Sequence, residues 1–465
     1  MRLVQLARGE QLTDKDLKRC GALAPEVVAF AQDIVNTVRE GGDEAVRDYC
    51  LKFDGVCPKQ FRVPDEVVQD APNKVDPKFL AAIKKAYKQI RDFHERERED
   101  SWFTTTDDGT ILGVKMVPLA TVAVYVPGGR AQYPSTVLMD VIPAKVAGVK
   151  RVTMLTPPQK DGTISSYTLA AAAIAGVDEV YAVGGAQAIA AVAYGTESIP
   201  KVDKIVGPGN AFVAAAKRSV SGDVGIDMVA GPSEVCVLAD GAADPTVIAA
   251  DLMAQAEHDP MATCYLVTDS AELADNVNAE LEKLLVQSPR EEITRKSLDH
   301  GVAVCTTDMD AAIDVVNVVA PEHLELHLPE AFSILGKIHN AGAIFVGPWS
   351  SEPLGDYVAG PNHTLPTGGT ALFSNPLGVY DFQKRSSIIS YTPEGLMKDA
   401  EATQTMAQAE GLWAHALSVG MRVKLIEKDE DHFKAGDDPT ADALHTAWPE
   451  ELQEPKKSFL NGGQE

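Results

Sequence analysis

The run Val122-Ala-Val-Tyr-Val126 and the turn Pro127-Gly128-Gly129 that follows it indicate the fold of this chain. A helical pattern continues from Val137 to Val149, and the next predicted strands are Arg151–Leu155 and Glu179–Val183. Apolar strands separated by helices are typical of a parallel sheet that is covered on both faces. The stretch therefore predicts an α/β domain.

A second alternation of strands and helices runs from Glu234–Ala239 to Ala343–Val346. We therefore expect two Rossmann-like parallel-sheet domains with a cleft between them. One predicted domain consists of residues 125–233, and the other combines residues 25–124 with residues 234–380.

The flanking regions are predicted to be mostly helical. Residues 1–24 are expected to form a helical N-terminal segment, and the chain up to about residue 115 shows mainly helical spacing. Residues 381–426 are expected to form a helical C-terminal domain, whose main helix runs from Leu396 to Val419. Residues 427–465 are acidic and contain proline, which predicts a flexible tail.

Composition and charge argue against two classes of partner. The chain has 465 residues, 45% of them hydrophobic, and a formal net charge of −25. It can therefore bury large cores, but it lacks the basic stripe that nucleic acid requires. The first residues have no apolar signal-peptide core, and no run approaches the roughly 18 apolar residues of a membrane helix. We expect a cytoplasmic protein that binds neither nucleic acid nor membranes.

The six cysteines show no pairing or metal-binding pattern, because none stands in a Cys-x-x-Cys arrangement. This disfavours both a disulfide framework and a thiolate zinc site. Any bound metal is therefore expected to have nitrogen and oxygen ligands.

Gln255 and His258 lie three residues apart on a predicted helix, so they would share one face of it. Such a pair alone is more often a solvated surface, but other histidines and carboxylates follow downstream. Glu322 beside His323 suits proton transfer at neutral pH, although a surface dipeptide would share this pattern. Asp356 and His363 lie in a loop rich in proline and glycine, and His415 lies within the predicted helix from Leu396 to Val419. Long loops of this kind often carry function.

Three glycine turns each follow a predicted strand and open a helix, where free N–H groups favour a phosphate. They are Pro127-Gly128-Gly129, Gly184-Gly-Ala-Gln187 and Gly207-Pro-Gly-Asn210. None fits the Gly-x-Gly-x-x-Gly fingerprint, and such glycines also occur as ordinary punctuation in α/β folds. A nucleotide site and simple turns therefore remain equal alternatives on this evidence.

Ten segments, in one order from about residue 25 to residue 425, resemble the histidinol dehydrogenases. The segments are Tyr125-Val-Pro-Gly-Gly-Arg130, Val183-Gly-Gly-Ala-Gln-Ala-Ile-Ala-Ala191, Val202-Asp-Lys-Ile-Val-Gly-Pro-Gly-Asn210, Ala230-Gly-Pro-Ser-Glu234, Gln255-Ala-Glu-His258, Ala320-Pro-Glu-His-Leu324, Gly355-Asp-Tyr357, Asn362-His-Thr-Leu-Pro-Thr367, Asp381-Phe-Gln-Lys-Arg385 and Glu410-Gly-Leu-Trp-Ala-His415.

This resemblance implies an NAD-dependent enzyme with one Zn²⁺ per subunit. Its reaction would be the four-electron oxidation of L-histidinol, via L-histidinal, to L-histidine, the last steps of histidine biosynthesis. The domain 125–233 would be the NAD side, and the domain containing 234–380 would be the substrate and zinc side. His323 would act as the general base, and Glu322 would activate the water that adds to the aldehyde.

The resemblance also assigns binding residues, position by position. The implied zinc ligands are Gln255, His258, Asp356 and His415. The implied substrate contacts are Ser233, Gln255, His258, His323, Asp356, His363, Glu410 and His415. The implied NAD contacts are Tyr125, Gln187 and Asn210.

An intertwined homodimer with shared active sites is implied as well, because residues 381–426 would reach into the other subunit's site. Glu410 and His415 are five residues apart, about 140° around an ideal helix, so one straight helix would not direct both at one ligand. Gly411 between them is a candidate break in the helix.

Two alternatives remain open. One is a paralogous zinc- and NAD-dependent alcohol dehydrogenase that acts on another small polar alcohol, such as sulfopropanediol. Glu410 and His363 suit the amine and imidazole of histidinol and favour the first interpretation. The other is a non-catalytic nucleotide- or metal-binding protein on the same fold. The presence of Glu322 and His323 together with the full ligand set argues against it.

Overall fold

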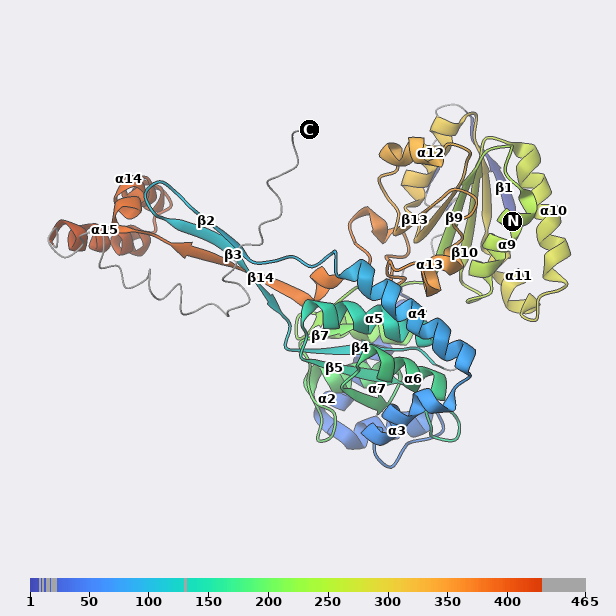
Figure 1. Cartoon of the computed structure of the whole chain (residues 1–465), viewed down its shortest axis with the longest axis horizontal. Coiled ribbons are helices and arrows are strands. Elements are labelled where there is room, and N and C mark those ends of the chain that lie inside the picture. Colours follow the sequence, from blue (N-terminus) through green and yellow to red (C-terminus); the bar gives the residue numbers. More distant parts are fainter. Residues whose placement is uncertain (8–9, 11, 14–16, 18–22, 129–131, 429–465) are drawn as a thin grey trace. The chain divides into compact units, whose positions relative to one another are not determined.

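The computed structural model describes residues 1–7, 10, 12–13, 17, 23–128 and 132–428 (Figure 1). The chain divides into two compact units. The large unit comprises Met1–Glu99 and Val117–Lys384, and the small unit comprises Asp100–Met116 and the chain from Arg385 onward. Both predicted parallel sheets are present in the large unit, which confirms the α/β class.

The first sheet of the large unit has five parallel strands. In spatial order they are β6 (Glu179–Ala182), β5 (Arg151–Thr156), β4 (Thr121–Tyr125), β7 (Lys204–Val206) and β8 (Gly225–Ile226). The helices between them are α5 (Pro134–Ala147), α6 (Ser166–Ala175), α7 (Gly185–Tyr194) and α8 (Ala211–Val220). The strand order reverses between β4 and β7, and a doubly wound sheet binds its ligand at such a switch point.

The alternating side chains of β4 face two separate cores. Val122 and Val124 pack with α5 and α6, whereas Ala123 and Tyr125 pack with α7 and α8. Because both faces of this strand are buried, its sequence is an unbroken apolar run rather than an alternating one.

The second sheet has six strands in the order β1 (Arg2–Gln5), β11 (Val302–Cys305), β10 (Thr263–Thr268), β9 (Glu234–Ala239), β12 (His323–His327) and β13 (Ala343–Val346). All the pairings between these neighbouring strands are parallel. Its helices are α9 (Pro245–Ala256), α10 (Ala271–Leu285), α11 (Glu291–His300), α12 (Met309–Val319) and α13 (Glu352–Tyr357). Apart from β1, this order repeats that of the first sheet, with the switch point between β9 and β12.

The prediction of a helical segment over residues 1–24 is wrong at Arg2–Gln5. These residues form β1, which pairs in parallel with β11. The added strand supplies hydrogen-bond partners to an edge that would otherwise be open.

Three N-terminal helices cover the five-stranded sheet rather than the second one. α2 (Pro25–Phe53) packs on α7 and α8, α3 (Asp65–Asp70) packs on α6, and α4 (Pro77–His94) packs on α5. These contacts differ from the predicted grouping of residues 25–124 with 234–380. Four short 3₁₀ helices complete the large unit, namely η1 (Ala71–Lys74), η2 (Ala331–Lys337), η3 (Thr370–Leu372) and η4 (Val379–Phe382).

The small unit contains a β-hairpin where helix was expected. β2 (Trp102–Thr105) and β3 (Ile111–Pro118) are antiparallel, and β14 (Gln383–Ser390) joins them in a three-stranded sheet. The prediction of mainly helical structure is therefore wrong for these strands. The turn between β2 and β3 contains Asp108-Gly109, with Gly109 at φ 79°. Asp-Gly is a hairpin signal, but the charged residues before it favoured the prediction of a helix.

The predicted helix from Leu396 to Val419 is divided in two, as α14 (Pro393–Ala409) and α15 (Trp413–Lys428). Gly411 lies between them at φ 73°, so the expected break is confirmed. The predicted acidic tail lies outside the described residues from position 429 onward. Within the described part of the chain, no helix combines the length and the apolarity needed to cross a membrane.

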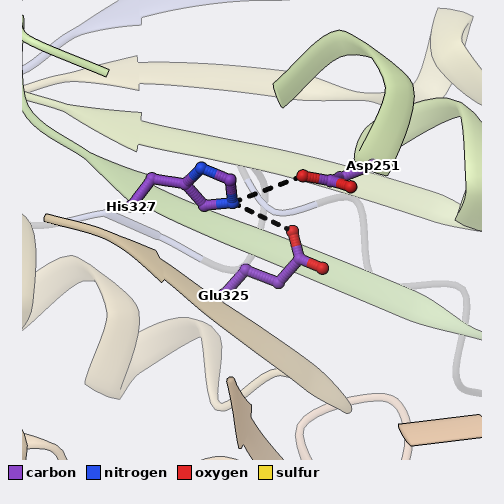
Figure 2. A group of neighbouring side chains, drawn as sticks. All are labelled: Asp251, Glu325 and His327. Atoms are coloured by element: carbon purple, nitrogen blue, oxygen red, sulfur yellow. Dashed lines mark ion pairs between the residues drawn. The ribbon is translucent and has the colours of Figure 1, made fainter. Parts of the chain in front are cut away.

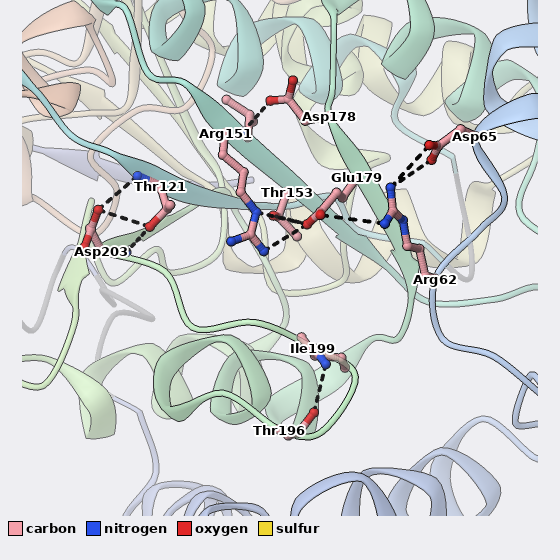
Figure 3. Close-up of polar contacts among 11 residues, drawn as sticks. Arg62, Asp65, Thr121, Arg151, Thr153, Asp178, Glu179, Thr196, Ile199 and Asp203 are labelled. Carbon is pink, nitrogen blue, oxygen red and sulfur yellow. Dashed lines mark hydrogen bonds and ion pairs between the residues drawn. The ribbon is translucent and has the colours of Figure 1, made fainter.

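Polar contacts close the amino edge of the five-stranded sheet (Figure 3). The backbone N–H and hydroxyl of Thr121 donate to Asp203 Oδ2 at 2.9 and 3.0 Å. Arg151 pairs with Glu179 at 3.0 Å across the starts of β5 and β6. With the amino edge closed by these contacts, the carboxyl edge is the one available to a ligand.

A buried ion pair fixes the turn after β7 at that carboxyl edge. Lys217 on α8 pairs with Asp227 and donates to the carbonyl of Gly207 at 2.8 Å. Asp227 Oδ2 in turn accepts the N–H of Gly207 at 2.8 Å. Gly207 has φ 106°, and a Cβ there would lie 2.3 Å from the carbonyl oxygen of Tyr125, so only glycine fits.

We predict that Lys217→Met lowers the free energy of unfolding by about 3–5 kcal/mol, because it leaves the carboxylate of Asp227 buried without the opposite charge of Lys217. A urea titration followed by far-UV circular dichroism measures the change. Lys296→Met is the matched control, because Lys296 forms an exposed pair with Glu292 and its loss should not change the midpoint measurably. Equal midpoints for the two variants would contradict this account.

Candidate functional site

Nitrogen and oxygen donors gather at the amino edge of the six-stranded sheet, where β9 and β12 begin. α9 runs back toward this edge, and α13 lies beside it. One possible ligand atom from each of His258, Glu352 and Asp356 lies within 4.8 Å of the others. The structure thus brings together two of the four implied zinc ligands, with Glu352 as an additional donor.

Gln255 is fully buried on the last turn of α9, and neither atom of its amide has a hydrogen-bond partner among the described residues. A buried amide without partners is costly, so a ligand at this position would relieve the cost. This observation fits a metal coordinated by the amide oxygen.

His258 does not share a helical face with Gln255, because α9 ends at Ala256. Instead, His258 follows in a turn, where its N–H donates to the carbonyl of Gln255 at 3.2 Å. Burial lowers the pKa of His258 and so favours the neutral imidazole. A neutral imidazole is the form that binds a metal.

Asp356 lies on the short helix α13 rather than in the predicted loop. Its Oδ1 is 3.6 Å from His323 Nε2 and 4.0 Å from His363 Nδ1. Burial alone would raise the pKa of Asp356, but the nearby imidazoles of His323, His363 and His258 hold it below its usual range. The carboxylate is therefore ionised at neutral pH, as a metal ligand requires.

Glu322 and His323 are both buried at the start of β12. His323 Nδ1 lies 3.1 Å from the carbonyl oxygen of Glu234, so in the neutral ring Nδ1–H donates there and Nε2 remains a base. Nε2 has no hydrogen-bond partner among the described residues and faces Asp356. The geometry therefore presents one basic nitrogen to a reacting group.

The side chain of Glu322 accepts the N–H of Glu234 at 2.8 Å and lies 3.8 Å from His323 Nδ1. Burial raises the pKa of Glu322 to about 7. Burial opposes protonation of His323, but the carboxylates of Glu322 and Asp356 outweigh it and raise the pKa of His323 to about 10. The pKa of Glu322 therefore lies near neutrality, and the two buried groups lie close together, an arrangement that suits acid–base chemistry.

Glu352 is a site residue that the sequence did not single out. It is buried, its Oε2 has no hydrogen-bond partner among the described residues, and burial raises its pKa to about 8. It precedes Asp356 by four residues, a spacing that places both on one helical face. This four-residue spacing could have identified Glu352 in the sequence, but only if residues 352–357 had been predicted to form a helix.

His363 has both ring nitrogens engaged within the protein. Nδ1 lies 3.0 Å from the carbonyl oxygen of Asp356, and Nε2 lies 3.2 Å from the hydroxyl of Thr136 at the start of α5. Ser233 stands directly before β9, where its carbonyl accepts the N–H of Thr263 at 3.0 Å. Both residues therefore lie within the large unit, and His363 also connects its two halves.

Glu410 and His415 belong to the small unit. Glu410 caps the end of α14, and His415 lies in the first turn of α15. Both are exposed. Their assignment to substrate and zinc stays a prediction, since the other implied ligands belong to the large unit.

The carboxyl edge of the five-stranded sheet borders a cavity of about 1080 Å³. Its lining includes all three implied NAD contacts, Tyr125, Gln187 and Asn210. The hydroxyl of Tyr125 accepts the N–H of Gly185 at 3.0 Å, and Asn210 caps α8 by accepting two N–H groups at 3.0 and 3.1 Å. Gln187 Oε1 is buried without a partner among the described residues. A cavity of this size at the switch point fits a dinucleotide.

No cysteine in the described part of the chain belongs to a group of possible metal ligands. The five cysteines described there are free, and burial raises the pKa of Cys264 to about 12. The donors at the amino edge are instead an amide, an imidazole and carboxylates, a set that suits a zinc-class ion at a site open to substrate.

Comparison with known proteins gives one consistent family. A family model described as histidinol dehydrogenase matches residues 18–423. Among curated relatives, histidinol dehydrogenase from Listeria innocua is 52% identical over 86% of this chain and 93% of its own length. The histidinol dehydrogenase from Bacillus subtilis is 50% identical over 92% of this chain and 100% of its own.

A solved structure agrees with this result. The crystal structure of histidinol dehydrogenase from Elizabethkingia anophelis superposes with a TM-score of 0.86 at 34% identity, covering 92% of this chain and 99% of that one. Family model, relatives and structure all extend across both sheets. The chain therefore belongs to the histidinol dehydrogenase family.

Proposed function

We propose that this protein oxidises L-histidinol through L-histidinal to L-histidine, using two NAD molecules per histidinol and one zinc ion in each active site. The observation that carries the proposal is the buried pair Glu322 and His323 beside Asp356, His258 and the unpartnered amide of Gln255. Family membership supports the choice of substrate. Nothing in the site or the comparisons favours the alternative of another small polar alcohol.

Gln255, His258 and Asp356 would hold the zinc ion, together with His415. Bound zinc would anchor the imidazole and amine of histidinol, and this positioning lowers the barrier by fixing the alcohol carbon for reaction. Tyr125, Gln187 and Asn210 would bind NAD in the cavity at the carboxyl edge of the five-stranded sheet.

In the first oxidation, His323 Nε2 would take the proton of the alcohol while a hydride leaves the same carbon for NAD. Glu322 would then remove a proton from a water molecule that adds to the aldehyde. The resulting hydrate would lose a second proton to His323 and a second hydride to another NAD. The sum is one histidinol, one water and two NAD giving one histidine and two NADH, with the released protons passing to solvent.

A homodimer with shared active sites is part of the proposal, and α15 supports it. Trp413, Leu417, Met421 and Leu425 are spaced by four residues and are all exposed, with Trp413 at 72%. An exposed apolar stripe at this spacing is suited to packing against another helix. We assign the stripe to a second copy of the chain, whose Gln255, His258 and Asp356 would receive His415.

The direct test is the yield of NADH from limiting L-histidinol at saturating NAD. Zinc-loaded protein should form two NADH per histidinol, because one site carries out both oxidations. Pretreatment with a chelator should abolish the reaction, and added zinc should restore it. No NADH from histidinol, with turnover of dihydroxypropanesulfonate or another alcohol instead, would contradict the proposed substrate.

Replacing Glu322 with glutamine should separate the two oxidations, because an amide cannot accept a proton from the attacking water. We expect Glu322→Gln to lower the rate of histidinal oxidation by about 10²–10⁴-fold and the first hydride transfer by much less. His323→Asn should slow both steps. Stopped-flow absorbance of NADH measures each step, and the exposed Glu401→Gln serves as control. Equal losses in both steps for Glu322→Gln would contradict its assigned role.

Mixing two chains that are each defective in histidinal oxidation tests the shared site. In a hybrid of a Glu322→Gln chain and a His415→Ala chain, one site would combine the intact Glu322 of one subunit with the intact His415 of the other. Random reassortment would make half the dimers hybrid with one working site each, so about one quarter of the wild-type histidinal oxidation should return. If each site were built within one chain, no activity would return on mixing.

A further inference from the structure

A second group of donors lies in the six-stranded sheet, and the proposed reaction does not use it. Asp251 comes from α9, and Glu325 and His327 come from β12. All three are buried, with exposed fractions of 8%, 0% and 4%. Figure 2 shows both carboxylates directed at the same ring nitrogen of His327. The group shares no residue with the cluster of His258, Glu352 and Asp356.

The distances from His327 to the two carboxylates are those of ligands around one ion, and all three ligand atoms lie within 4.8 Å of one another. His327 Nε2 lies 3.3 Å from Asp251 Oδ2 and 3.4 Å from Glu325 Oε2. Hydrogen bonds between an ionised donor and a carboxylate are shorter, at about 2.7–2.9 Å. Ligand atoms at about 2.0–2.1 Å from a tetrahedral zinc ion are about 3.3–3.4 Å from one another.

The two carboxylate atoms that face His327 lack other partners. Asp251 Oδ2 and Glu325 Oε2 are buried and have no hydrogen-bond partner among the described residues. The other oxygen of Glu325 accepts the N–H of Glu352 at 2.7 Å. Each carboxylate therefore keeps a free oxygen that is directed into the group.

Charge balance points the same way. Two carboxylates and one protonated imidazole leave a net charge of −1 in a buried space, which is costly. A divalent cation with two carboxylates and a neutral imidazole leaves no net charge. Imidazole with carboxylates favours a zinc-class ion over Ca²⁺ or Mg²⁺, which prefer oxygen ligands alone.

We propose that Asp251, Glu325 and His327 bind a second, structural zinc-class ion in each subunit. It would hold α9 against β12 and, through Glu325, the N-terminal end of α13. These elements carry Gln255, His323 and Asp356, so the second ion would stabilise the framework of the first site. The proposal does not depend on the reaction assigned above, because it concerns only the number of bound ions.

Metal counting tests the proposal. The full-length protein is stripped with a chelator, reloaded with Zn²⁺, passed over a desalting column and measured by plasma mass spectrometry. The wild type should hold two zinc ions per subunit. Glu325→Gln should hold one, since the amide keeps the contact with Glu352 but loses the charged ligand. His258→Ala, which affects the other cluster, should also hold one, and the double variant none.

Cobalt supplies a second readout that does not depend on activity. After reloading with Co²⁺, the visible absorption of Glu325→Gln should lack the contribution that His258→Ala retains. Circular dichroism checks folding, and Asp251→Asn replaces Glu325→Gln if that variant fails to fold. A zinc count in Glu325→Gln equal to that of the wild type would overturn the proposal. In that case the group would be held together by a proton on His327. Burial alone would lower the pKa of His327, but the carboxylates of Asp251 and Glu325 raise it to about 9.

Discussion

Burial of charged and polar side chains at the amino ends of β9 and β12 is the constraint on which the site depends. These two strands are parallel neighbours that begin with Glu234 and His323, so their first residues lie side by side. Taking such groups out of water is favourable only when each finds a partner. The carbonyl of Glu234 lies 3.1 Å from His323 Nδ1, and the N–H of Glu234 donates to Glu322. The amide of Gln255 and His323 Nε2 have no hydrogen-bond partner among the residues that the structure describes.

The same burial supplies the chemistry. It raises the pKa of Glu322 toward neutrality, while neighbouring carboxylates keep His323 basic. Groups held in this way need little rearrangement during reaction, which is how a fixed polar environment lowers a barrier. Different edges of the two sheets carry the two parts of the candidate site. The carboxyl edge of one sheet borders the dinucleotide-sized cavity, and the amino edge of the other carries the acid–base pair.

Much of this fold could be predicted from the sequence, because strands buried on both faces are continuous apolar runs. The edge strand β1 and the hairpin β2–β3 could not, since they are short, carry polar residues and are stabilised by partners distant in the sequence. For the site, Gln255 and His258 stood out by spacing, although α9 ends between them and tertiary structure brings them together. Glu352 and the Asp251–Glu325–His327 group were missed because their burial depends on contacts between α9, β12 and α13 that local patterns do not record. The roles of Tyr125, Gln187 and Asn210 came from resemblance, not from chemistry that the sequence displays.

In the proposed reaction, one site performs both oxidations and keeps the reactive aldehyde bound between them. Oxidation of limiting L-histidinol in the presence of excess semicarbazide, which captures free aldehydes, tests this most directly. If Glu322 and His323 act on a bound intermediate, the yield should stay at two NADH per histidinol and no semicarbazone should form. A yield that falls to one NADH, with the semicarbazone of histidinal as product, would show that the aldehyde leaves the site and would contradict the account.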